Sequence, residues 1–187
     1  MITRPRQIEI ENAVVGLLKD FGITQYPMGI NVIAEALGIQ MVPYSSLSFA
    51  ERQLAFASSD DAFTMRTNDF TSAQVLFDDT NGAYYYRSRF SCAHEVGHIY
   101  LEHTEGLLNC ESEANYFAGY LLAPHPLVLR RKPGQSIKDL FGISGDCAQV
   151  AFEQAQRRER EGGCWRPHEY WLIKNVEWKG GGAYGRI

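Results

Sequence analysis

The apolar positions in the first forty residues repeat with the spacing of amphipathic helices. Over residues 4–21 they recur every three or four positions, so they share one face of a predicted helix. These positions are Ile10, Val14, Leu17, Leu18 and Phe21. Gly22 follows where a helix C-cap is expected. The run INVIAEALG predicts a second, shorter helix that ends at Gly38, and residues 39–42 predict a strand.

Between residues 53 and 78 the pattern changes to short runs that are typical of β-strands. The three strand candidates are residues 53–57, 62–67 and 73–77. Serine and aspartate residues separate the first two runs, and Asn81-Gly82 follows the third as a strong turn signal. The aspartates of these turns show no calcium-loop spacing, so turn formation explains them better than cation binding. This region therefore predicts a β meander.

Residues 87–103, RSRFSCAHEVGHIYLEH, contain no proline and predict a helix that carries the candidate chemistry. His94 and His98 are four residues apart, so they lie on one helix face and both imidazoles can reach a single ion. Zinc prefers such nitrogen ligands at roughly 2.0–2.1 Å. Glu95 lies beside this face, where its carboxylate can take a proton from a metal-bound water. The H-E-x-x-H pattern therefore indicates metal-dependent hydrolysis.

A second acidic stretch, CESEANYFAGYLLAP over residues 110–124, can supply a third metal ligand. Glu111 shares a helix face with Asn115, whereas Glu113 points about 200° away at roughly 100° per residue. Only one of the two glutamates can therefore face the ion, and we favour Glu111, with Glu113 as the fallback ligand. Asn115, one turn further on, is expected to orient a ligand through its amide.

Two more residues near His98 need an interpretation. Glu102 comes four positions later and is a candidate to support a ligand from outside the metal sphere. His103 comes five positions later, off the ligand face of a continuous helix, and is not expected to be a ligand unless the helix ends early. Two histidines, one carboxylate and a water would make a catalytic zinc site rather than a structural one.

The two motifs together resemble the ImmA/IrrE family of zinc metallopeptidases. RSRFSCAHEVGHIYLEH followed by ESEANYFAGYLLAP carries the resemblance, and the segment ALGIQMVPY is also similar, so the likeness covers roughly residues 8–150. His94, Glu95 and His98 match the first motif directly, and Glu111 matches the first glutamate of the E-x-E-A-N pattern. Val96 stands where the family often has leucine, which is a conservative departure.

The resemblance implies a Zn²⁺-dependent endopeptidase with a narrow protein substrate. A member fused to a DNA-binding domain would carry that domain before the first helix; here only residues 1–3 precede the predicted helix, so we expect the chain to resemble the stand-alone members. These are encoded in mobile elements and cleave a partner helix-turn-helix repressor. The alternative is a zinc-binding sensor or regulator that acts through a protein partner and cuts nothing. An intact Glu95 favours the enzyme.

Composition and charge argue against several other functional classes. The formal net charge of -4 gives the chain no field that would attract nucleic acid, so no direct nucleic-acid binding is expected. No apolar run approaches the roughly 20 residues of a membrane span. The chain has no signal core, and its four cysteines are scattered, so we expect a reduced, cytoplasmic protein. Residues 136–160 predict two helices around a GISG break, which we interpret as packing helices rather than a DNA-binding motif.

These observations predict a single α+β domain. A zincin-like metal helix would pack with further helices around a small, mostly antiparallel sheet. The metallopeptidase domain would span residues 1–161, and residues 162–187 would form a C-terminal tail containing a strand at residues 170–178.

Overall fold

The computed structural model describes residues 2–67, 72–80, 82, 85–104 and 108–178. They fall into two compact units, one formed by Gly29–Ala118 and the other by the segments up to Met28 and from Gly119 onward. The expectation of a domain at 1–161 followed by a tail stays a prediction.

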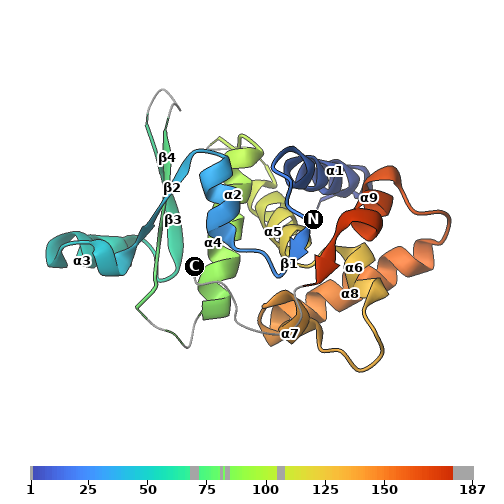
Figure 1. Cartoon of the computed structure of the whole chain (residues 1–187). Helices are drawn as coiled ribbons and strands as arrows, with labels where there is room; N and C mark the ends of the chain where they lie inside the picture. The colour runs from blue at the N-terminus through green and yellow to red at the C-terminus, as the bar shows by residue number, and fades with distance from the viewer. Residues whose placement is uncertain (1, 68–71, 81, 83–84, 105–107, 179–187) are drawn as a thin grey trace. The chain divides into compact units, whose positions relative to one another are not determined.

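The first unit contains a three-stranded sheet of β2 (Ile39–Pro43), β3 (Ala62–Arg66) and β4 (Ala73–Phe77), in the order β2-β4-β3 (Figure 1). β4 pairs with β2 in parallel and with β3 in antiparallel orientation. The α+β class is confirmed, but the sheet is mixed rather than mostly antiparallel. The reason is that the β3–β4 hairpin returns its second strand to the middle of the sheet, where it runs in the direction of β2.

The segment between β2 and β3 corrects the predicted meander. Residues 53–57 are not a strand but lie within helix α3 (Phe49–Ser58), which follows the short 3-10 helix η1 (Tyr44–Ser46). A capping box starts α3: the Glu51 amide donates to Ser48 Oγ, and the Ser48 amide donates to the Glu51 carboxylate. These bonds satisfy amides that otherwise lack partners at a helix start. The other two predicted strands are confirmed, and Asn81 lies outside the described residues.

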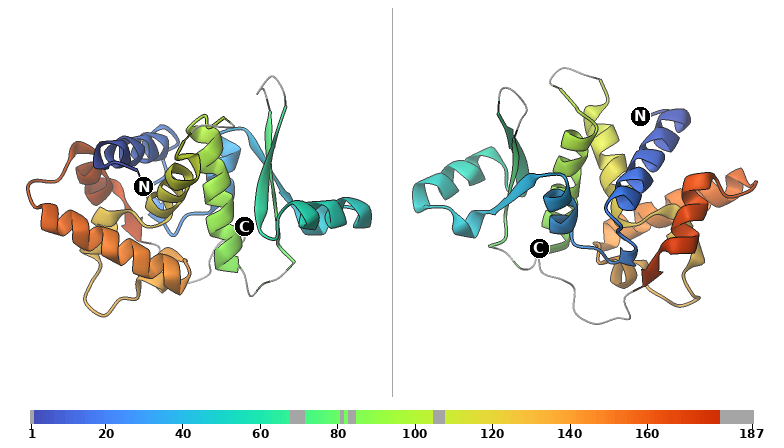
Figure 2. Two further views of the ribbon diagram at one scale, coloured as in Figure 1. Left: turned by 180° about the vertical axis from the view of Figure 1, so that it is seen from behind. Right: turned by 45° about the horizontal axis from the view of Figure 1, so that its top comes forward.

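Helices cover both faces of this sheet (Figure 2). Helix α4 (Tyr85–Tyr100) packs on β3 and β4, and α2 (Ile30–Ala36) packs on β2 and α4. Helix α3 lies on the opposite side, where Tyr44, Phe56 and Phe63 pack together. On β3, Phe63 thus faces α3, which leaves its neighbours Thr64 and Arg66 on the α4 side because side chains alternate along a strand.

Helix α5 (Cys110–Leu122) approaches α4 closely at Gly97. A β-carbon built on Gly97 would lie 2.9 Å from Phe117 Cδ1 and 3.3 Å from Phe117 Cβ. Phe117 is fully buried, so its ring has no free space to move into. The missing side chain of Gly97 therefore sets how closely the first half of α5 can lie against α4.

Replacing Gly97 by alanine should destabilise the protein by about 1–3 kcal/mol, because overpacking at Phe117 outweighs the gain of about 1 kcal/mol in helix propensity. The matched control is Gly16→Ala in α1 (Arg4–Asp20), where an added β-carbon meets nothing within 4 Å. That variant should be neutral or stabilised. Urea unfolding of both variants measures the difference. A Gly97→Ala chain as stable as wild type would contradict the close contact.

The second unit is mainly helical. It contains α1, α6 (His125–Arg130), α7 (Ile137–Phe141), α8 (Gly145–Glu161) and α9 (Pro167–Asn175). The short strands β1 (Gln25–Tyr26) and β5 (Glu177–Trp178) pair in parallel. Helix α6 packs on α8 and α9, and α9 also packs on α1. The helices predicted at residues 4–21 and 136–160 are confirmed. None of the helices in the described residues is long and apolar enough to cross a membrane.

The strand predicted at residues 170–178 is wrong over most of its length. Residues up to Asn175 belong to helix α9, and only two residues form β5. Pro167 opens the helix, at a position where its missing N–H costs nothing. The carboxylate of Glu169 accepts from the Arg166 amide at 2.7 Å, which satisfies another amide of the helix start.

A buried polar cluster joins α1, α8 and α9. Glu169 accepts two hydrogen bonds from Arg158, at 2.6 and 2.8 Å, and Glu11 lies 2.6 Å from Arg4 Nη1. His168 Nε2 lies 3.1 Å from Glu11 Oε2. Three of these residues are spaced closely enough to hold a metal ion. However, each carboxylate is already paired with an arginine, so we interpret the cluster as structural.

Candidate metal centre

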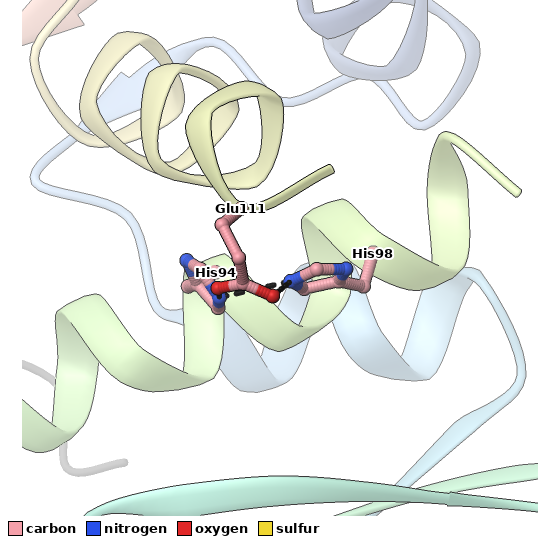
Figure 3. Close-up of side chains that lie close together, drawn as sticks. All are labelled: His94, His98 and Glu111. Atoms are coloured by element: carbon pink, nitrogen blue, oxygen red, sulfur yellow. Dashed lines mark hydrogen bonds and ion pairs between the residues drawn. The ribbon is translucent and has the colours of Figure 1, made fainter. Parts of the chain in front are cut away.

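Helices α4 and α5 bring His94, His98 and Glu111 together (Figure 3). The two Nε2 atoms are 2.9 Å apart, and each lies 3.3 Å from one oxygen of the Glu111 carboxylate. One ligand atom from each residue falls within 4.8 Å of the others. The three side chains converge on one point, as Figure 3 shows. They form a group that can hold a metal ion.

Local structure explains this convergence. The histidines are one turn apart on α4, as the sequence predicted, and Glu111 lies in the first turn of α5. A carboxylate is favourable there because helix amides give the N-terminus a partial positive charge. The Glu111 side chain is 78% exposed, whereas the histidine side chains are 15% and 17% exposed. The group thus opens to solvent on the glutamate side.

Glu95 lies beside this group rather than in it. Its Oε2 accepts a hydrogen bond of 2.5 Å from Thr64 Oγ1 on strand β3. Burial raises the pKa of Glu95, and the Thr64 hydrogen bond partly opposes that effect. A carboxylate with a raised pKa is a stronger base, and the contact with the neighbouring strand holds it in one place. Sequence analysis did not find Thr64, although strand alternation places it on the α4 side of β3.

Asn115 lies where the sequence predicted, one turn after Glu111. Its Oδ1 is 3.1 Å from His94 Nδ1. An amide oxygen can only accept, so His94 carries a proton on Nδ1, and in the neutral imidazole the Nε2 lone pair faces Glu111. Burial of His98, together with the neighbouring His94, lowers the pKa of His98 to about 4, so His98 is neutral near pH 7. Neutral imidazole is the form that binds metal ions.

The remaining candidates lie elsewhere. Glu113 is not grouped with His94 and His98, because its Oε2 lies 3.3 Å from His103 Nε2 instead. Glu102 is exposed and follows the end of α4 with φ 55°, so it does not stand one helical turn from His98. His103 does approach His98, with 3.1 Å between their Nδ1 atoms. Helix α4 therefore does end early, which was the condition for His103 to be a ligand. However, His103 contacts His98 Nδ1, not the Nε2 atom that faces Glu111.

A comparison with known families identifies the family of the domain. A peptidase family model, described as the IrrE N-terminal-like domain, matches residues 28–158. No curated protein sequence matches the chain significantly. The matched segment contains both motifs, both glutamates of the second motif and Thr64. The match covers well over half of the chain, which therefore belongs to the family of the IrrE N-terminal-like peptidase domain.

Proposed function

We propose that this protein is a zinc-dependent endopeptidase that hydrolyses a peptide bond in a repressor-like regulatory protein. One observation carries the proposal. The two histidines of H-E-x-x-H meet a carboxylate from a second helix, while the glutamate between them stays outside the group and close to it. Ligands and proton acceptor are thus separate side chains, as hydrolysis by a metal-bound water requires.

The donor atoms suit zinc. In a tetrahedron with bonds of roughly 2.0–2.1 Å, ligand atoms are about 3.3 Å apart. The Glu111 oxygens lie at 3.3 Å from the histidine nitrogens, and the two nitrogens are slightly closer at 2.9 Å. Two imidazoles and one carboxylate also form a typical catalytic zinc set, which leaves one position for water. His94, His98 and Glu111 are therefore the proposed ligands.

The chain's own residues then handle the proton. Zinc at this site would supply Lewis acidity to the scissile carbonyl and lower the pKa of a bound water. Glu95 accepts the proton of the attacking water and delivers it to the nitrogen of the leaving amine. Thr64 fixes the Glu95 carboxylate through Oε2, so the other oxygen is the one that moves the proton. Burial of Glu95 raises its pKa, which makes the carboxylate a stronger base toward the water.

The proposed substrate is a helix-turn-helix repressor protein. Resemblance to stand-alone ImmA/IrrE members supports a helix-turn-helix repressor as the protein partner. The net charge of -4 supports a partner other than nucleic acid. We also propose that the protein acts in the cytoplasm, as expected from its scattered cysteines. The non-proteolytic sensor is the competing hypothesis, and the test below separates the two.

The test uses the full chain loaded with zinc and a helix-turn-helix repressor encoded next to it. We expect the repressor to be cut at a defined bond, identified by mass spectrometry. EDTA should stop the cleavage, and added zinc should restore it. A His94→Ala chain serves as the control for contaminating proteases. A repressor that binds the zinc-loaded chain and stays intact would favour the sensor over the peptidase.

A further inference from the structure

Behind His98 two further side chains form a hydrogen-bonded row. His98 Nδ1 lies 3.1 Å from His103 Nδ1, and His103 Nε2 lies 3.3 Å from Glu113 Oε2. The row starts at a proposed ligand and ends at the second glutamate of E-x-E-A-N. His103 is buried, and the side chain of Glu113 is only 14% exposed. The proposed reaction leaves both residues without a role.

The end of helix α4 builds this row. The His103 amide donates to the His98 carbonyl at 3.0 Å, and the Glu102 amide donates to the Ile99 carbonyl at 3.1 Å. Glu102 has φ 55°, so the chain reverses in a Schellman-type ending. His103 therefore lies back over the last turn of the helix. Its ring packs edge to face on that of His98, with 5.0 Å between the ring centroids. Arg66 of β3 donates to the His103 carbonyl at 3.3 Å and holds the reversed segment.

With Glu113 ionised and His103 neutral, the hydrogen bonds of this row run in one direction. The Glu113 carboxylate is an acceptor, so His103 must donate from Nε2. A neutral His103 then has a lone pair at Nδ1, and the proton between the two rings belongs to His98 Nδ1. His98 Nε2 is consequently left with its lone pair, on the side of Glu111. As the acceptor at the end of the row, Glu113 thus selects, through a neutral His103, the tautomer of His98 that can bind a metal ion.

We propose that His103 is a positioning residue that couples the carboxylate of Glu113 to His98, fixing its orientation and increasing its strength as a metal ligand. The inference rests on the proposed zinc site and assigns a different role to each of the two glutamates. Glu111 would bind the ion, whereas Glu113 would act on it through two imidazoles. His94 is supported differently, by the neutral amide of Asn115.

Metal affinity is the first test, measured on the full chain by competition with a chromophoric chelator. Removal of such an outer partner typically weakens binding about 10–100-fold. We expect a loss of this size for Glu113→Gln, which keeps the size of the side chain but removes its charge, and for His103→Phe. The matched control is Glu102→Gln, which removes the same charge one residue from His103 and should bind zinc as wild type does.

Two further measurements separate positioning from a general effect on folding. Thermal unfolding in EDTA should show Glu113→Gln close to wild type, so its weaker zinc binding would not reflect a damaged fold. Long-range proton–nitrogen correlation spectra of the zinc-loaded chain should show His98 protonated at Nδ1 and His103 at Nε2. A proton on His103 Nδ1, or wild-type affinity in both variants, would overturn the proposal.

The outcomes also distinguish this inference from the proposed function. If the wild-type chain binds zinc tightly and all variants bind it equally well, only the coupling through His103 is wrong. If zinc binding falls in the two variants but no repressor is ever cut, the coupling stands and the peptidase is wrong. Cleavage is therefore not needed as a readout for His103 or Glu113.

Discussion

Replacing Glu95 by glutamine should reduce cleavage of the repressor by a factor of at least about 10²–10⁴, the usual contribution of a general base. Glutamine has the same size and can still accept from Thr64 Oγ1, so the local hydrogen bond and the fold should survive. The amide cannot take up a proton at neutral pH. Because Glu95 lies outside the three-residue metal group, the zinc content should stay that of wild type.

The measurement compares wild type, Glu95→Gln and His94→Ala, each expressed together with the repressor, and follows the length of the repressor. We expect the repressor to stay intact with both variants, while only His94→Ala also loses zinc. A sensor that acts by holding zinc and binding a partner has no proton to move. Normal biological output from Glu95→Gln alongside an inactive His94→Ala would therefore establish the sensor in place of the peptidase.

The two residue pairs at the proposed site could be predicted because each pair depends on helix periodicity alone. His94 and His98 are four residues apart, and Glu111 and Asn115 share a face of the next helix, so each pair needed only the correct element type. The same geometry predicted that only one of Glu111 and Glu113 can face the ion, and the resemblance favoured Glu111. Both glutamates nevertheless contribute to the arrangement, since Glu113 lies against His103.

The missing parts of the site depend on tertiary structure. Thr64 reaches Glu95 because β3 lies at the edge of the sheet next to α4, and no local pattern specifies that strand order. His103 reaches His98 because Glu102 adopts a left-handed conformation. Glycine or asparagine usually marks such a helix end, and glutamate gives no comparable signal. The H-E-x-x-H pattern thus predicted the two histidines of the proposed metal group but not the side chains that contact His98 and Glu95.

The two wrong strand predictions have a local cause instead. The run around Leu54 and Phe56 was assigned to a strand although Ser48 and Glu51 form the S-x-x-E signature of a capping box. The aromatic and branched residues of 170–178 favoured a strand, but Pro167 and Glu169 start a helix just before them. In both segments the signals at the helix N-terminus decided the structure, whereas residue propensity alone gave the wrong element.

The second large effect concerns the third ligand. Glu111→Ala should lose the zinc on dialysis, because it removes one of three protein ligands and leaves the two histidines alone at the site. Glu113→Ala should keep one zinc per chain at high zinc concentration, since its carboxylate touches His103 rather than the metal group.

Elemental analysis of both variants, dialysed side by side against buffer with and without a chelator, makes the comparison. Glu113→Ala should release its zinc at a lower chelator concentration than wild type does. Its zinc affinity should decrease about 10–100-fold, as expected when a residue that supports a ligand is removed. Circular dichroism checks that both chains are folded. Loss of zinc from Glu113→Ala together with full retention by Glu111→Ala would exchange the roles of the two glutamates. The exposed Glu111 would then be a surface residue, and the distances of 3.3 Å to His94 and His98 would have no functional meaning.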